Sequence, residues 1–130
     1  NEKILKNKEV VILNFFGALQ NYFKYAKSVF MGKSMIEKLK TTGGQSPIEA
    51  AKLNCKIYHG PYVYNFKEIY NFLKSYEISE EIYSDKELSE KLMVDLKDSK
   101  NDQNKITSSI NDIGLKILNN TTQEISKFII

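Results

Sequence analysis

Apolar side chains recur every three or four residues over most of this chain of 130 residues, which is the spacing of one face of an α-helix. The widest face lies between residues 2 and 40, so we expect one long N-terminal helix there, or two collinear ones. The short run Val10–Leu13 could alternatively be a strand, although no second run is strong enough to pair with it. The main stripe is Ile12, Phe15, Leu19, Tyr22, Ala26, Val29 and Ile36, and Phe16, Phe23 and Phe30 lie beside it.

Capping signals divide the rest of the chain into further helices. Thr41–Gly44 ends the first helix, and the capping pattern Ser46, Pro47 and Glu49 predicts a second one over about 47–58. His59, Gly60 and Pro61 then break that helix. Asn65 with Glu68 predicts a helix over about 66–76, and Ser84 with Glu87 opens another, anchored by Leu88, Leu92 and Leu96. The stripe Ile106, Ile110, Ile113 and Ile117 predicts a last helix.

Three stretches separate these helices. Residues 77–84 are typical of a loop or a single helical turn, and residues 97–105 carry no apolar side chain, which favours a loop or a frayed helix. Residues 119–122 interrupt the last helix before a final turn. The expected fold is therefore all-α: one domain over residues 1–130, a bundle of four to six helices with a long N-terminal helix, and no convincing strand.

All 19 basic residues are lysine, and the net charge is +3. Without guanidinium groups the chain cannot grip guanine or phosphate in the bidentate way that arginine does. The charge is uneven, because residues 1–60 hold ten lysines against four acids and residues 61–130 hold nine lysines against twelve. The mild net charge makes nucleic acid an unlikely partner, although the lysine-rich N-terminal half keeps it as the alternative.

The chain has one cysteine and one histidine, Cys55 and His59. Four residues apart, they would share a face of a continuing helix and could form a thiolate–imidazole pair or half of a metal site. The favoured interpretation is a small core residue and a loop histidine. The carboxylate pairs Glu80 with Glu81 and Asp95 with Asp98 fit solvated helix faces. We therefore expect no enzyme activity, no catalytic residues, no metal and no cofactor.

An aromatic segment is the most distinctive feature of the sequence. Packing at the edge of the core is its first interpretation, a protein interface the second and single-stranded nucleic acid the third. The candidate partner-binding residues are Tyr58, Tyr62, Tyr64 and Lys67. The aromatic residues are Tyr58, Tyr62, Tyr64, Phe66, Tyr70, Phe72 and Tyr76, with Lys56, Lys67 and Lys74 among them.

This arginine-free, helical, lysine-, isoleucine- and asparagine-rich composition resembles the ectodomains of small all-helical outer-surface lipoproteins of Borrelia-type spirochaetes. The resemblance implies surface display and binding of a host or partner protein, and no site residue can be transferred from it. The first residue is not methionine, which suggests a processed chain, with room for a lipid tether upstream of residue 1.

The expected function is that of a non-enzymatic helical interaction protein, cell-surface or extracellular, which binds a protein partner. No membrane span is expected. The wide apolar face of the first helix would also allow a homodimer. The alternative is a cytoplasmic regulatory protein that binds nucleic acid or another macromolecule through the lysine-rich N-terminal half.

Overall fold

The structure is a computed structural model that describes residues 9–14, 17, 19–97 and 103–129, with side chains described from residue 108 onward in the last range. Within these residues the chain forms five α-helices and a three-stranded sheet, so the expected all-α bundle is wrong. The elements in chain order are α2 (Leu19–Phe23), β1 (Ser28–Met31), the 3-10 helix η1 (Glu37–Leu39), α3 (Ile48–Lys52), β2 (Lys56–His59), the 3-10 helix η2 (Tyr64–Phe66), α4 (Lys67–Ser75), β3 (Ser79–Glu81), α5 (Asp85–Lys97) and α6 (Gln103–Ser126).

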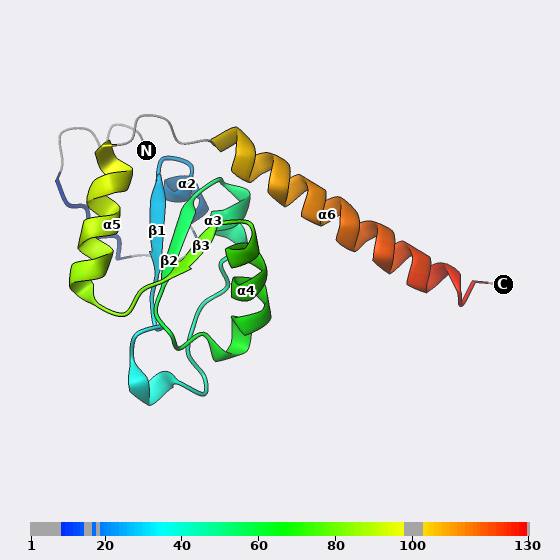
Figure 1. Cartoon of the computed structure of the whole chain (residues 1–130), viewed down its shortest axis with the longest axis horizontal. Coiled ribbons are helices and arrows are strands. Elements are labelled where there is room, and N and C mark those ends of the chain that lie inside the picture. The colour runs from blue at the N-terminus through cyan, green and yellow to red at the C-terminus, as the bar shows by residue number, and fades with distance from the viewer. Residues whose placement is uncertain (1–8, 15–16, 18, 98–102, 130) are drawn as a thin grey trace.

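The sheet is fully parallel, in the order β1-β2-β3. Val29 lies opposite Ile57, and Ile57 lies opposite Ser79. Parallel strands require a crossover connection, and the segments that contain α3 and α4 supply the two crossovers. The carboxyl ends of all three strands therefore meet at one edge of the sheet. Figure 1 shows α5 on one side of the sheet, α3 and α4 on the other, and α6 leading away from the body.

The long N-terminal helix expected over residues 2–40 is wrong, because a strand occupies its centre. α2 ends at Phe23, and β1 begins five residues later. Val29 and Phe30 fit the helical stripe in sequence, yet in a strand successive side chains point to opposite faces. β1 has only four residues, too few for alternation to be told from helical spacing. Residues 2–8, Phe15 and Phe16 of that prediction lie outside the described residues.

The helix expected over 47–58 is shorter than predicted. α3 covers Ile48–Lys52, and Asn54 has a φ of 63°, the left-handed conformation that ends a helix. The chain then enters β2, so Tyr58, assigned to this helix, and His59, expected to break it, both belong to the sheet. Pro47 stands at the cap position and no side chain caps the helix, in contrast to the capping role expected of Ser46.

The ranges predicted for the next two helices are confirmed, but Leu96, expected to anchor α5, is 69% exposed, and no side chain caps α4, in contrast to the role expected of Asn65. α4 matches the predicted range, and α5 begins with the expected capping pair. The Glu87 amide donates to Ser84 Oγ at 3.1 Å, and Glu87 Oε2 accepts from the Tyr83 amide at 2.8 Å. Residues 77–84 contain β3 in addition to a loop. α6 runs through residues 119–122 without the expected interruption, and residues 98–102 of the predicted loop are not described.

The main hydrophobic core lies between the sheet and the two helices α3 and α4. Ile57 is fully buried there, and so is Ile78, in the turn before β3. The small residues of α3 let that helix approach the strands closely. The buried cluster comprises Met31, Ala50, Ala51, Cys55, Ile57, Val63, Tyr70, Leu73 and Ile78.

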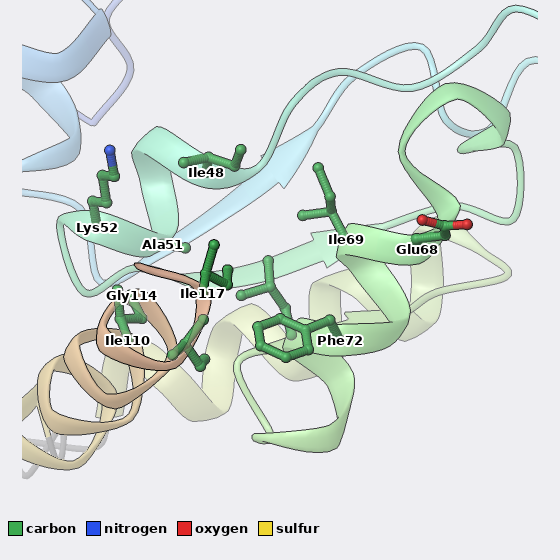
Figure 2. A pocket seen from close by; sticks show the side chains of 11 residues that line it. Ile48, Ala51, Lys52, Glu68, Ile69, Phe72, Ile110, Gly114 and Ile117 are labelled. Atoms are coloured by element: carbon green, nitrogen blue, oxygen red, sulfur yellow. The ribbon is translucent and has the colours of Figure 1, made fainter. Parts of the chain in front are cut away.

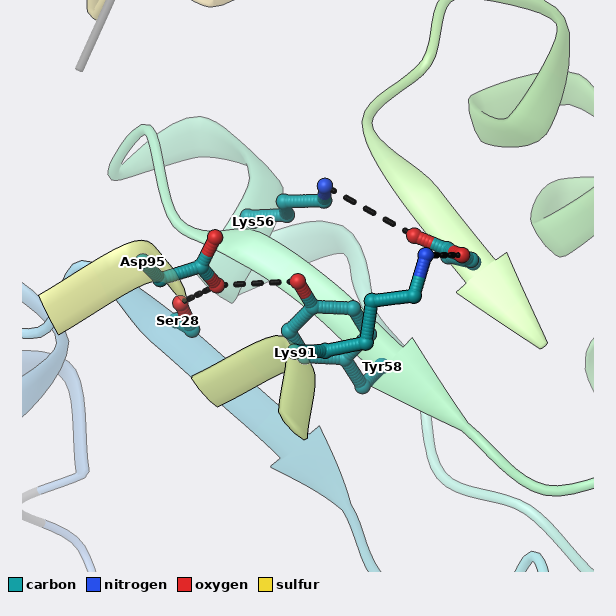
Figure 3. A network of polar contacts seen from close by, with 6 residues as sticks. Ser28, Lys56, Tyr58, Lys91 and Asp95 are labelled. Atoms are coloured by element: carbon teal, nitrogen blue, oxygen red, sulfur yellow. Dashed lines mark hydrogen bonds and ion pairs between the residues drawn. The ribbon is translucent and has the colours of Figure 1, made fainter. Parts of the chain in front are cut away.

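The opposite face of the sheet is covered by α5 through polar contacts (Figure 3). Tyr58 is fully buried and donates its hydroxyl to Asp95 Oδ2 at 2.9 Å, and Ser28 Oγ donates to the same oxygen. Glu80 pairs with Lys56 at 3.6 Å and with Lys91 of α5. Burial, and then the hydrogen bond to Asp95, raise the pKa of Tyr58, so the hydroxyl stays a donor at neutral pH. α5 has no fully buried residue, although Leu88 and Leu92 are half-buried, so this network makes a large part of its contact with the sheet.

Asp95→Ala is expected to lower the free energy of unfolding by about 2 kcal/mol, because it leaves the buried Tyr58 hydroxyl without an acceptor. Urea unfolding followed by circular dichroism measures the change. Glu90→Ala, at an exposed position of the same helix, is the control and should change stability by less than about 0.5 kcal/mol. Equal effects of the two substitutions would show that the network does not hold α5.

Candidate functional site

The four candidate partner-binding residues do not form one surface. Tyr58 is fully buried beneath α5, so in this fold it cannot touch a partner. Tyr62 is half-buried, whereas Tyr64 is 66% exposed and Lys67 is exposed at the start of α4. The last two residues follow β2 and lie in the chain just beyond its carboxyl end. Some residues of the aromatic segment therefore pack inside the protein, whereas others lie in an exposed loop.

Cys55 and His59 do not form the thiolate–imidazole pair considered from the sequence. Residues 56–59 are a strand, so the two residues are separated by roughly 13 Å of extended backbone. Cys55 is fully buried, and its Sγ donates to the Phe23 and Ala26 carbonyls at 3.3 and 3.5 Å. Burial raises the pKa of this thiol to about 11, which keeps it protonated at neutral pH. The thiol holds α2 against the sheet.

One of the two carboxylate pairs, Glu80 with Glu81, separates in the fold. Glu80 faces α5, and because Glu81 is the next residue in the strand it points to the other face. Asp95 belongs to the network with Ser28 and Tyr58, and Asp98 lies outside the described residues. The Glu80–Glu81 pair therefore does not place two carboxylates on one face of the sheet.

Three loops converge at the carboxyl edge of the sheet: residues 32–36 after β1, 43–47 before α3 and 60–63 after β2. Ser34 joins them, because its fully buried hydroxyl donates to the Met31 carbonyl at 2.6 Å and accepts from the Gly60 amide at 2.8 Å. Its carbonyl accepts from the Tyr62 amide at 2.8 Å, and the Lys33 carbonyl accepts from the Gly44 amide at 3.3 Å. We name these three loops the edge loops.

Glycines are required where the edge loops touch. A Cβ on Gly43 would lie 2.5 Å from the Leu39 carbonyl oxygen and 2.8 Å from that of Tyr62. A Cβ on Gly60 would lie well within 3.0 Å of the Ser34 carbonyl oxygen. Gly44 has a φ of 90°, which side chains other than hydrogen rarely tolerate. Backbone therefore packs directly on backbone at this edge.

Two aromatic rings, those of His59 and Tyr70, contact the edge loops. His59, the last residue of β2, is 4% exposed, and its Nδ1 lies 2.7 Å from the Gly60 carbonyl oxygen. The rings of His59 and Tyr70 contact each other at a tilt of 43°, with centroids 4.2 Å apart. The Tyr70 hydroxyl donates to the Gln45 carbonyl at 2.8 Å. One side chain of α4 therefore links the histidine to the loop that precedes α3.

The surface around the edge loops carries excess positive charge, beside the exposed apolar side chains of Met35 and Ile36. Residues 32–46 contain Lys33, Lys38 and Lys40 against Glu37, and residues 60–66 contain no charged residue. Lys33 is exposed and has a φ of 60°, an uncommon conformation for a residue with a side chain. Sequence reasoning took Gly43-Gly44 and Gly60-Pro61 as helix breakers. Read as turns after two strands, the same residues would have indicated this site.

A second feature is an apolar groove of about 500 Å³ between α3, α4 and the first half of α6 (Figure 2). Ile113 is nearly buried against this groove, whereas Phe72 is 37% exposed. Beyond it, the outer part of α6 carries exposed Leu115, Leu118 and Ile125, and Ile129 follows the end of the helix; their exposed fractions lie between 54% and 72%. The groove is lined by Ile48, Ala51, Lys52, Glu68, Ile69, Phe72, Leu73, Ile110, Ile113, Gly114 and Ile117.

In the described ranges, no three histidine, cysteine or acidic side chains come together as a group that could hold a metal ion. No helix of those ranges combines the length and apolarity that a bilayer span requires. A scan of the sequence against protein-family models finds no match, and a search of curated proteins finds no significant relative. The geometry of the edge loops and of α6 is therefore what bears on function.

Gly60→Ala is expected to destabilise the protein by about 1–3 kcal/mol, because the added methyl group collides with the backbone of Ser34. Gly32→Ala is the matched control in the neighbouring loop, since a Cβ there meets nothing within 4 Å. Thermal and urea unfolding of both variants provide the measurement. A neutral Gly60→Ala would contradict the backbone-to-backbone contact.

Proposed function

We propose that the edge loops bind a small anionic ligand that carries a phosphate group. In open sheets of parallel strands, ligands bind outside the carboxyl ends of the strands, and this fold-level rule points to the edge where the loops after β1 and β2 meet. The single observation that supports the proposal is the glycine-dependent packing of these loops, which brings three backbone segments together beneath the exposed Lys33, Gln45 and Ser46.

The charge at this edge favours an anion. Lys33 is an exposed ammonium group at the carboxyl end of β1, and the segment that follows its loop, residues 37–42, carries two further lysines against one acid. Gln45 and Ser46 are exposed in the loop before α3 and offer neutral donors. Lysine binds phosphate as a point charge without the bidentate geometry of arginine. The absence of arginine from the sequence is therefore compatible with phosphate binding, and the proposal assigns no reaction to the chain.

The backbone of Lys33 supports a role beyond packing. A left-handed conformation costs a residue with a side chain about 1–2 kcal/mol, and such strain is found most often at functional sites. The Gly44 amide holds this conformation through its hydrogen bond to the Lys33 carbonyl. Glycine would adopt the same backbone without this cost.

Lys33→Gln is expected to weaken binding of pyrophosphate or of a nucleoside monophosphate at least about tenfold, because it removes a charged hydrogen-bond donor. Titrations followed by amide chemical shifts give the affinities, and the amides of Ser34, Gly44 and Tyr62 should respond first. Lys116→Gln, an exposed lysine of α6, is the control and should bind as the unmodified protein does. If pyrophosphate and the nucleoside monophosphates change the chemical shift of none of these three amides, the proposal is refuted.

The outer part of α6 supports a second function, the docking of a protein partner. Residues 119–122 read Asn-Asn-Thr-Thr, all poor helix formers, and an unsupported helix of this length is marginal in water. The apolar residues spaced at three and four along this part are exposed. Packing against another protein surface would supply the missing stabilisation. The protein partner and the cell-surface location expected from the sequence remain proposals of this kind.

If the exposed apolar residues of the outer part of α6 bind a partner and do not stabilise the fold, Ile125→Ser should change the free energy of unfolding by less than about 0.5 kcal/mol. Ile113→Ala, one of the groove residues and only 8% exposed, should cost about 2 kcal/mol. Urea unfolding compares the two. A large loss in Ile125→Ser would show that this residue packs within the chain, and the docking proposal would then lose its support.

A further inference from the structure

We propose that His59 makes the edge loops sensitive to acid: protonation of its ring removes the support beneath Gly60, loosens the loops and weakens ligand binding there. The ligand-binding half of this inference rests on the proposed function, whereas the loosening of the loops does not.

The geometry fixes which nitrogen takes the proton. Nδ1 lies 2.7 Å from the Gly60 carbonyl oxygen, which can only accept, so Nδ1 carries the hydrogen of the neutral ring. Nε2 is then the basic nitrogen. The ring is 4% exposed and contacts Tyr70. A charged ring in this position loses most of its contact with water, and no acidic side chain makes a hydrogen bond to it among the described residues.

The groups around the ring come from three elements. On α4, Tyr70 stays neutral because burial raises the pKa of its hydroxyl, and Lys74 opposes a second positive charge. At the end of β3, Glu81 favours the charged ring. Met31, opposite His59 on β1, is apolar. Burial outweighs the Gly60 hydrogen bond and Glu81, so the pKa of His59 lies below its ordinary value of 6.5.

The ring is coupled to the loops through Gly60. The Gly60 carbonyl accepts from His59, and the Gly60 amide donates to Ser34, whose own carbonyl holds Tyr62. Tyr70 contacts His59 and also holds the Gln45 carbonyl. A ring that turns out toward water to solvate its charge would give up both contacts. The loops after β1 and β2 and the loop before α3 would then loosen together.

The direction of the pH dependence follows from the lowered pKa. Above pH 6.5 the ring is neutral in both the closed and the opened loops, and His59 does not favour either. As the pH falls below 6.5, the opened form takes up a proton first, so the opened form gains population until the pKa of the closed form is passed. Acid therefore opens the edge, and neutral pH restores it.

Amide hydrogen exchange tests the opening without any ligand. Protection factors, corrected for intrinsic exchange, would be compared at pH 7 and pH 5 for the Gly60 and Tyr62 amides and for Leu88 of α5, which donates to Ser84. Protection of the edge amides relative to Leu88 should fall about fivefold or more in acid, a typical size for such coupling. The sole histidine of the chain gives one unambiguous imidazole signal, which should titrate below 6.5.

His59→Phe keeps an aromatic ring against Tyr70 and cannot titrate, so the fall in relative protection should vanish. His59→Gln serves the same purpose if the phenylalanine variant does not fold. An unchanged ratio in the unmodified protein would overturn the inference, as would an equal fall in both variants. Binding of sulfate, which does not titrate in this range, tests the ligand-binding half of the inference. No binding at pH 7 refutes the proposed function alone. Equal binding at pH 7 and pH 5 refutes the link between His59 protonation and ligand affinity.

Discussion

The parallel pairing of β1, β2 and β3 is the constraint on which the rest of the structure depends. Parallel strands bring their carboxyl ends to one edge and need cover on both faces. The two faces are covered in different ways. α3 and α4 bury an apolar core around Ile57, whereas α5 is held by Asp95 and Glu80 over a face that carries Ser28 and Lys56. The edge is left to the loops.

Backbone packing makes those loops a defined surface. Gly43 and Gly60 allow three chain segments to approach to distances that any side chain would prevent, and Ser34 satisfies the polar groups at the junction. Such packing leaves few ways to rearrange, so the exposed side chains stand on a rigid base. His59 lies within that base, which is why a single titration beneath Gly60 could alter the whole edge.

The sequence revealed the structure wherever the determining contacts are local. α4 and α5 were predicted because Asn65, Glu68, Ser84 and Glu87 are capping signals read within four residues, and the Ser84–Glu87 hydrogen bonds are present. The strands were missed because their pairing is non-local and their composition is atypical. Buried parallel strands usually read as apolar runs, but β3 is Ser-Glu-Glu and β2 contains lysine and histidine. The candidate Tyr58 failed for the same reason, since a strand places it under α5.

In α6 the helical pattern of the sequence and the contacts with the rest of the chain do not extend over the same residues. Its first half repeats isoleucine at helical spacing and lies against α3, where Ile113 is nearly buried. Its second half passes through four poor helix formers while its apolar residues face water. The sequence expectation of a break at residues 119–122 followed correctly from propensity. A continuous helix there would gain stability by packing against another surface, and for this reason α6 is the proposed docking site of a protein partner.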